Sequence, residues 1–244
     1  MLIVGLTGGI ASGKSTVSEL MAQEHGLTIV DADLIARQVV EPGNRAYNSI
    51  VSHFQPLVPD LLLSDGKLNR PALGKYVFAH EDERKVLNKL THPWIRLEMV
   101  KQILWAYFSA KRLVILDVPL LFESGLDLIC GSTVCVICSE EEQLKRIQQR
   151  NVGVSEEEAR QRIASQMKTS DKVKKADIVI DNSGTKSQLK DQVNSAVTRL
   201  TPGLFMWLIT LLPPLGVLSA LHTWTVRRVQ EKLSQRKDSN KKRD

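Results

Sequence analysis

The sequence predicts an α/β fold in which five parallel strands form a doubly wound sheet. Short apolar runs rich in β-branched residues recur along the chain, and each is nearly continuous rather than alternating. That pattern is typical of strands covered on both faces, as in a parallel sheet. Amphipathic stretches separate the runs, and strands that alternate with helices indicate this class. The expected strands are residues 2–7, 27–33, 112–117, 133–139 and 176–182.

Seven amphipathic stretches are expected to be helices. Ser155 and Glu158 stand three residues apart at the start of the last one, which predicts a capping box. A largely helical insert, about residues 42–110, separates the second and third strands. The expected helices are residues 14–24, 44–54, 70–79, 81–89, 93–109, 140–150 and 155–168.

The basic character of the chain is concentrated at its end. Residues 227–244 contain eight Lys or Arg and three Asp or Glu, so all but one of the six net positive charges lie there. The remainder is nearly neutral, and no nucleic-acid partner is expected for it.

The three cysteines are too few for a disulfide framework and indicate a reducing compartment. Cys135 and Cys138 form a CxxC inside an expected strand. Residues three apart on a strand point to opposite faces, so we expect these thiols to pack rather than to bind a metal.

A glycine-rich loop, GGIASGKS, matches G-x-x-x-x-G-K-[ST] between an expected strand and an expected helix. Main-chain N–H groups at a helix N-terminus can surround a phosphate where side chains are small. We expect Lys14 to bridge the β- and γ-phosphates of ATP or GTP, and the Ser15 hydroxyl to bind Mg²⁺. An ordinary glycine-rich turn is the alternative, which the flanking elements disfavour. The expected nucleotide-binding residues here are Gly8, Gly9, Ile10, Ala11, Ser12, Gly13, Lys14, Ser15 and Thr16.

Three aspartates follow expected strands. Asp117 ends one of them and could hold a Mg²⁺-bound water, although an incidental strand-end Asp is the alternative. Asp31 and Asp33 end the second strand with side chains on one face, which suits a general base beside a transferred phosphoryl group. Guanine specificity is not expected, because residues 88–91, NKLT, lack the Asp of Asn-Lys-x-Asp.

With these motifs in place, the chain resembles the dephospho-CoA kinases, which use ATP to phosphorylate the ribose 3′-hydroxyl of dephospho-CoA and so make coenzyme A. DAD-x-I-AR-x-V and D-x-PLLFE are more specific than the glycine-rich loop. The resemblance implies a P-loop nucleoside-kinase-like fold, ATP as co-substrate, Mg²⁺, and an acceptor site in the helical insert. The matching stretches, in order over residues 1 to about 185, are LTGGIASGKST, DADLIARQVVEPG, DGKLNRPALGKYVF, THPWI, LDVPLLFESG, QLKRIQQR and ADIVIDNSG.

The resemblance also implies roles for the acceptor side. Asp33 would be the catalytic base that takes the 3′-hydroxyl proton; an N-cap of the next helix is the structural alternative. The residues that would bind dephospho-CoA are Asp31, Arg37 and His92. The alternative for Arg37 is an exposed arginine on a helix, and for His92 a histidine with a structural role.

On the nucleotide side, Arg146 and Arg150 lie four residues apart on one helix face. The resemblance places them in a lid, about residues 146–170, that brings arginine onto the transferring phosphoryl group; a solvated basic face is the alternative. It places Asn182 and Gly184 beside the adenine.

Beyond the expected kinase domain, residues 1–200, the composition changes. Residues 200–226 contain no Asp, Glu, Lys or Arg. As a helix, residues 204–221 would reach roughly 27 Å, close to a hydrocarbon core of about 30 Å. Membrane association of residues 201–226 is expected, with a buried helix as the alternative. A single span, a hairpin bent at Pro213 and Pro214, and an interfacial helix remain open.

Residues 227–244 are expected to be a basic, disordered tail. Fungal dephospho-CoA kinases are similar in carrying such a segment, which favours the cytoplasmic face of the mitochondrial outer membrane or endoplasmic reticulum. A kinase of another nucleoside or small alcohol is the alternative activity. A membrane-tethered nucleotide-binding scaffold without turnover is the alternative class, and the oligomeric state is left open.

Overall fold

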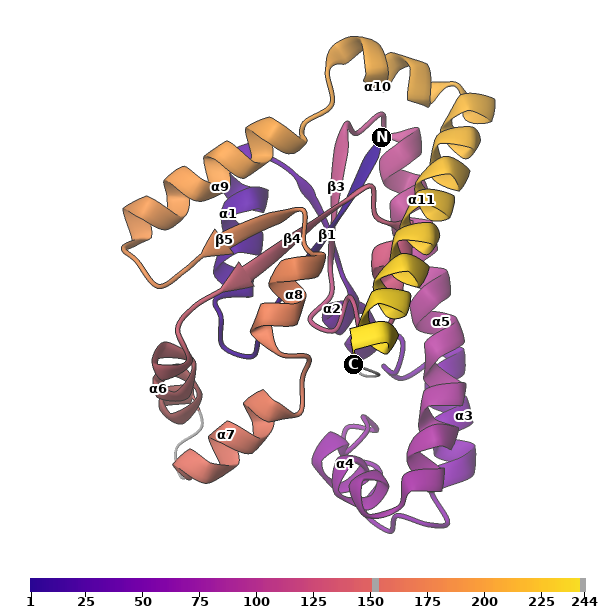
Figure 1. Cartoon of the computed structure of the whole chain (residues 1–244). Helices are drawn as coiled ribbons and strands as arrows, with labels where there is room; N and C mark the ends of the chain where they lie inside the picture. The colour runs from indigo at the N-terminus through magenta and orange to yellow at the C-terminus, as the bar shows by residue number, and fades with distance from the viewer. Residues whose placement is uncertain (151–153, 242–244) are drawn as a thin grey trace. The chain divides into compact units, whose positions relative to one another are not determined.

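The computed structural model describes residues 1–150 and 154–241 and has the expected α/β architecture (Figure 1). It divides into two compact units. The larger combines Met1–Val30 with Ala106–Asp244, and the smaller is Asp31–Trp105.

Five strands form one sheet in the order β2-β3-β1-β4-β5, and β1 pairs in parallel with β3 and β4, as β4 does with β5. Every residue of β3 is buried, which explains why its sequence is continuously apolar up to the final Asp117. The strand bounds are β1 Leu2–Gly8, β2 Thr28–Asp31, β3 Leu113–Asp117, β4 Ser132–Ile137 and β5 Ile178–Asp181.

The larger unit packs helices against this sheet. Its core joins strand residues such as Val4 and Ile115 to Val17 and Met21 of α1 and to Val193 of α9. Its complete helices, with η1 a 3₁₀ turn, are α1 Lys14–His25, η1 Leu126–Ile129, α6 Glu140–Arg150, α7 Glu156–Ala164, α8 Thr169–Lys175, α9 Lys186–Leu200, α10 Leu204–Leu211 and α11 Pro213–Lys241.

The smaller unit is helical and has a core of its own around Ile50, Phe54, Leu61 and Leu73. The guanidinium of Arg45 lies 5.4 Å from the ring centroid of Trp94, a cation–π contact within the unit. Its helices are α2 Ala32–Gln38, α3 Arg45–Phe54, α4 Arg70–Ala79 and α5 Glu81–Phe108, the last of which continues into the larger unit.

The second strand is shorter than predicted. β2 ends at Asp31, whose carboxylate accepts from the main-chain N–H groups of Asp33 and Leu34 and so caps α2. Aspartate is a favoured N-cap, and this bond turns the chain into a helix where a strand was predicted. Asp31 and Asp33 therefore do not share a strand face, and the cap is Asp31 rather than Asp33.

The two helices predicted on either side of Pro93 form one helix, α5. A proline removes the single hydrogen bond that its N–H would donate to the carbonyl four residues earlier, here that of Lys89. Both residues are exposed, so water can replace that bond.

The last of the predicted helices is shorter than expected. The helix predicted over residues 155–168 ends at Ala164, and α8 follows as a separate helix. The capping box is confirmed, because the Ser155 hydroxyl accepts from the Glu158 N–H and the Glu158 carboxylate from the Ser155 N–H.

The C-terminal helices pack against the rest of the larger unit. The Met1 ammonium lies 2.7 Å from the Thr210 hydroxyl, and the Tyr107 hydroxyl lies 3.1 Å and 3.0 Å from the carbonyl oxygens of Thr210 and Leu211. Arg112 stacks on the Trp207 ring. Since Met1 precedes β1, α10 sits at the start of that strand, at the opposite end from the glycine-rich loop (Figure 1).

Further along, α11 is joined to the start of β4. The Arg227 guanidinium lies 2.5 Å from the Asp177 carboxylate and 3.3 Å from the Gly131 carbonyl. Burial alone would raise the pKa of Asp177, but the bonds from Arg227 and Thr133 lower it below its ordinary value. Residues 227–241 continue α11, where the composition predicted a disordered tail.

Within the described residues, no single helix is both long and apolar enough to cross a bilayer. Leu204–Leu211 and Pro214–Gln230 meet that criterion only as a pair, bent by 106° at the break between them.

Candidate functional site

The glycine-rich loop connects β1 to α1 as predicted. Gly13 is the N-cap residue of α1 and has φ +91°, a left-handed conformation that glycine adopts without strain. A Cβ at that position would stand 1.9 Å from the Asn182 side-chain nitrogen. No side chain caps α1, so the N–H groups of its first turn remain suited to an anion.

Ala11 gives the loop an unusual shape. Its φ is +58°, and the left-handed region costs a non-glycine residue about 1–2 kcal/mol. Contacts on both sides of Ala11 must therefore hold the main chain in place.

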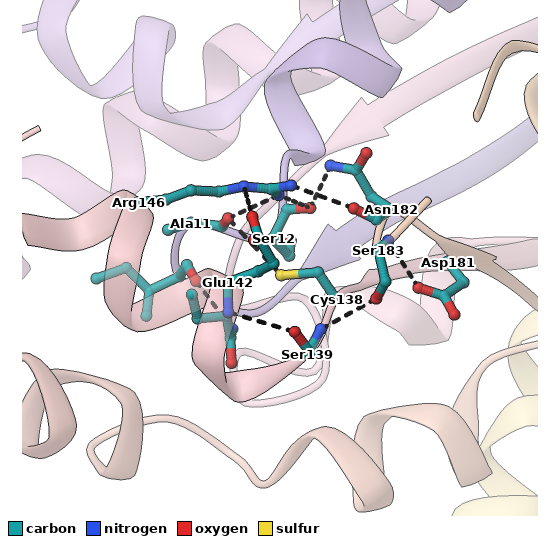
Figure 2. A network of polar contacts seen from close by, with 11 residues as sticks. Ala11, Ser12, Cys138, Ser139, Glu142, Arg146, Asp181, Asn182 and Ser183 are labelled. Atoms are coloured by element: carbon teal, nitrogen blue, oxygen red, sulfur yellow. Dashed lines mark hydrogen bonds and ion pairs between the residues drawn. The ribbon is translucent and has the colours of Figure 1, made fainter. Parts of the chain in front are cut away.

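One set of these contacts comes from α6 and from the loop after β5. Arg146 donates from its guanidinium to the carbonyl oxygens of Ala11 and Ser12, each at 3.4 Å, and to that of Asn182 at 3.2 Å. The Asn182 side chain donates to Ser12 at 2.8 Å (Figure 2). Arg146 also pairs with Glu142 one turn earlier on α6. Its guanidinium is thus held at the main chain of the loop, and its role at the phosphoryl group stays a prediction.

Two glutamines hold Ile10, the residue before Ala11. Gln166, after α7, accepts from the Ile10 N–H at 3.0 Å. Gln143, on α6, donates to the Ile10 carbonyl at 2.9 Å. A cavity of about 540 Å³ lies beside them, lined by residues that include Gly9, Ile10, Gln143, Arg160, Ile163 and Gln166.

Lys14 and Asp117 form an ion pair between the first turn of α1 and the end of β3. The Asp117 side chain is only 3% exposed and that of Lys14 17%. Ser15 and Thr16 follow on the first turn of α1 with exposed side chains. An uncapped helix N-terminus, a lysine, a hydroxyl and a carboxylate are the donor and acceptor types that a nucleotide phosphate with Mg²⁺ requires, so these residues fit such a group.

A buried lysine joins α8 to the loop after β3. The Lys172 ammonium, on α8 and 1% exposed, lies 3.0 Å from the Glu123 carboxylate and 3.3 Å from the Pro119 carbonyl. Glu123 also accepts from the Met167 N–H at 3.2 Å. Pro119 accepts in turn from the Thr7 hydroxyl at 2.8 Å.

Most of the other predicted site residues are exposed and lie on helices. In the smaller unit, Asp33 lies in the first turn of α2 and is exposed, as are Arg37 on α2 and His92 on α5. In the larger unit, Arg150 is the exposed last residue of α6, and Gly184 precedes the capping box of α9.

The cysteines behave as packing residues. Burial raises the pKa of Cys130 to about 12 and that of Cys135 to about 11. Within the described residues, no group of three or more His, Cys, Asp or Glu side chains is arranged to hold a metal ion.

The family model for dephospho-CoA kinase matches residues 2–188. The chain belongs to the dephospho-CoA kinase family. A dephospho-CoA kinase of Saccharomyces cerevisiae is 48% identical, over 98% of this chain and 99% of its own length. That of Geobacillus kaustophilus is 46% identical, over 79% of this chain and 93% of its own.

A solved structure supports the same assignment. The dephospho-CoA kinase from Campylobacter jejuni has a TM-score of 0.64 and 30% identity, over 82% of this chain and 96% of its own. The yeast match, at 98% of this chain, takes in the C-terminal helices, which lie beyond the last residue of the family model.

Sequence reasoning missed Gln143, Gln166 and Lys172. Gln143 shares a helix face with Arg146, three residues later, and that spacing could have indicated it. Gln166 and Lys172 act through contacts between segments distant in the chain, for which the sequence carries no local signal.

Proposed function

We propose that this chain transfers the γ-phosphoryl group of ATP to the ribose 3′-hydroxyl of dephospho-CoA, yielding coenzyme A and ADP. Membership of the dephospho-CoA kinase family carries this proposal. ATP as the donor is supported by the uncapped N-terminus of α1, which follows β1 and the glycine-rich loop and carries Lys14 paired with Asp117.

The proposed reaction is an in-line displacement at the γ-phosphorus. The acceptor oxygen forms a bond to the γ-phosphorus, the bond from that phosphorus to the bridging oxygen breaks, and ADP leaves. We propose that Asp33 takes the proton of the 3′-hydroxyl. Loop N–H groups and the Lys14 ammonium balance negative charge on the phosphates.

Mg²⁺, when bound with the nucleotide, neutralises phosphate charge and fixes the geometry of the leaving group. Ser15 and Asp117 would hold it, directly or through water. Arg146 and Arg150 are proposed as lid cations, Asn182 and Gly184 as neighbours of the adenine, and Asp31, Arg37 and His92 as contacts for dephospho-CoA.

An acceptor profile tests the proposal. With ATP and Mg²⁺ at saturation, we expect ADP release with dephospho-CoA to exceed that with adenosine, shikimate or gluconate by at least about a thousandfold in kcat/KM, since a site that hydrogen-bonds its own substrate discriminates strongly against acceptors that lack those bonding groups. Turnover confined to another acceptor would favour a different small-molecule kinase. ATP binding without turnover on any acceptor would favour a scaffold.

We also propose that the C-terminal helices bind a lipid surface through residues about 200–226. One side of this pair contacts the rest of the larger unit through Thr210 and Arg227, while Phe205 and Met206 are 75% and 60% exposed. Exposed apolar side chains of this density mark interaction surfaces. The bend between α10 and α11 favours a helix pair lying in the interface over a straight span. The others exposed are Leu204, Leu208, Leu212, Leu215, Val217, Leu218, Leu221, Trp224 and Val226.

The membrane proposed is the cytoplasmic face of the mitochondrial outer membrane or of the endoplasmic reticulum. ATP and the cationic end of the chain would both remain on the cytoplasmic side. Attraction of that cationic end to anionic lipid would add to the apolar contact.

Flotation with vesicles tests the lipid proposal. We expect the full chain to float with vesicles of phosphatidylcholine and phosphatidylserine, and a Phe205→Ser, Met206→Ser, Leu218→Ser variant to stay at the bottom with its kcat unchanged, because the apolar contact is lost. Phe78→Ser is the matched control, since Phe78 is 86% exposed but lies in the smaller unit. Equal flotation of the triple variant, or none by the parent chain, would refute the lipid contact.

A further inference from the structure

Two glutamines near the ends of the expected lid, about residues 146–170, form contacts that the phosphoryl-transfer chemistry does not use. Gln143 lies on α6, before the expected lid begins, and Gln166 lies after α7, within its last five residues. They are 23 positions apart in the sequence but bind the two polar groups of one residue, Ile10.

Donor and acceptor roles are fixed by the main chain. A peptide N–H can only donate, so Gln166 presents its carbonyl oxygen to it; a peptide carbonyl can only accept, so Gln143 presents its NH₂ group. Gln143 is 4% exposed. A Cβ on Gly9 would stand 2.5 Å from the Gln143 side-chain nitrogen, so glycine at that position leaves the room that Gln143 occupies.

The hydrogen bonds to Ile10 stabilise the main chain next to Ala11. Ala11 occupies the left-handed region, which an alanine leaves readily unless its neighbours are fixed. Gln143 and Gln166 fix the peptide groups on its amino side, and Arg146 binds its own carbonyl. The phosphate-binding shape of the loop is thus set by side chains of α6 and of the segment after α7.

We propose that Gln143 and Gln166 are positioning residues that hold the glycine-rich loop in its ATP-binding shape by binding Ile10 from α6 and from the segment after α7. The inference rests on the proposed ATP-dependent reaction. Its consequence is that these two contacts and ATP binding stabilise each other, so losing either contact weakens ATP binding.

Replacement by methionine, which matches glutamine in length but lacks its amide, tests the proposal. We expect Gln143→Met and Gln166→Met each to raise the Kd of ATP, measured by calorimetry, and its KM roughly fivefold, the usual effect of losing one hydrogen bond. The KM of dephospho-CoA should change by less than about twofold. Because both act on Ile10, the double variant should fall short of the product of the two effects.

Gln148→Met on α6 and Gln161→Met on α7 are matched controls, since both side chains are exposed. Both should bind ATP as the parent chain does.

Glutamate substitutions separate positioning from general disturbance. Gln166→Glu keeps an oxygen for the Ile10 N–H, whereas Gln143→Glu removes the donor and sets a carboxylate against a carbonyl. Both add the same charge beside Ile10. We expect ATP binding to weaken roughly fivefold more in Gln143→Glu than in Gln166→Glu.

Unchanged ATP affinity in both methionine variants would overturn the proposal, as would equal losses in the two glutamate variants. An equal rise in both substrates' KM together with a lower Tm would also overturn it, because that result indicates a structural role alone. A parent chain that binds ATP but does not phosphorylate dephospho-CoA would refute the proposed acceptor and leave the ATP measurements intact.

Discussion

Asp33→Asn is expected to lower kcat about a thousandfold while leaving the Kd of ATP unchanged. The substitution keeps the size of the side chain and replaces the basic carboxylate, which we propose accepts the 3′-hydroxyl proton, by a non-basic amide; general bases contribute about 10²–10⁴ in rate. The expected loss corresponds to about 4 kcal/mol of transition-state stabilisation. Single-turnover phosphoryl transfer at saturating dephospho-CoA measures it directly.

The fold should survive this change. The cap of α2 comes from Asp31, so Asn at position 33 leaves the helix start intact. Asp60→Asn is the matched control, since Asp60 is an exposed aspartate of the same unit. Full activity in Asp33→Asn would remove Asp33 from its role as base.

Lys14→Met is expected to lower kcat/KM for ATP by about a thousandfold or more. The lysine cation is proposed to bind the phosphates throughout the transfer, and electrostatic groups aimed at developing charge contribute about 10²–10³ each. Loss of ground-state ATP binding adds to this figure, so a weaker Kd should accompany the lower kcat. Stopped-flow binding and steady-state kinetics separate the two.

The structure adds a consequence for stability. Lys14 is paired with Asp117, whose carboxylate is buried at the end of β3, and removing one partner of a buried pair costs about 3–5 kcal/mol. We therefore expect a lower Tm for Lys14→Met. Lys14→Arg is the control: it retains the charge and the pairing with Asp117 but lacks the compact ammonium, so its Tm should recover while its kcat stays low. Restored kcat in Lys14→Arg would contradict the proposed bridging role.

The sheet could be predicted because strands buried on both faces have continuously apolar sequences. β3 and β4 are continuous apolar runs, and they form strands as expected. The end of β2 could not be predicted in the same way, since Asp31 caps a helix that competes with strand continuation. The prediction that α5 would be two helices was wrong, because Pro93 removes only one main-chain hydrogen bond and an exposed part of a helix tolerates that loss.

The position of the glycine-rich loop between β1 and α1 could be predicted, because the need for glycine there is dictated locally by the shape of the main chain. Gly13 shows this in its positive φ and its closeness to Asn182. What holds the loop could not be predicted, since Gln166 and Asn182 reach it from segments more than 150 residues away. Such contacts exist only once the sheet has brought those segments together.

The direct test of the central claim is the chemical position of the transferred phosphate. The chain is incubated with ATP, Mg²⁺ and dephospho-CoA, and the product is examined by ³¹P NMR and by its activity with a CoA-dependent enzyme. We expect a new phosphomonoester on the ribose 3′-oxygen, one equivalent per ADP formed, and full function as coenzyme A. Phosphate on any other oxygen, or ADP released without a phosphorylated acceptor, would contradict it.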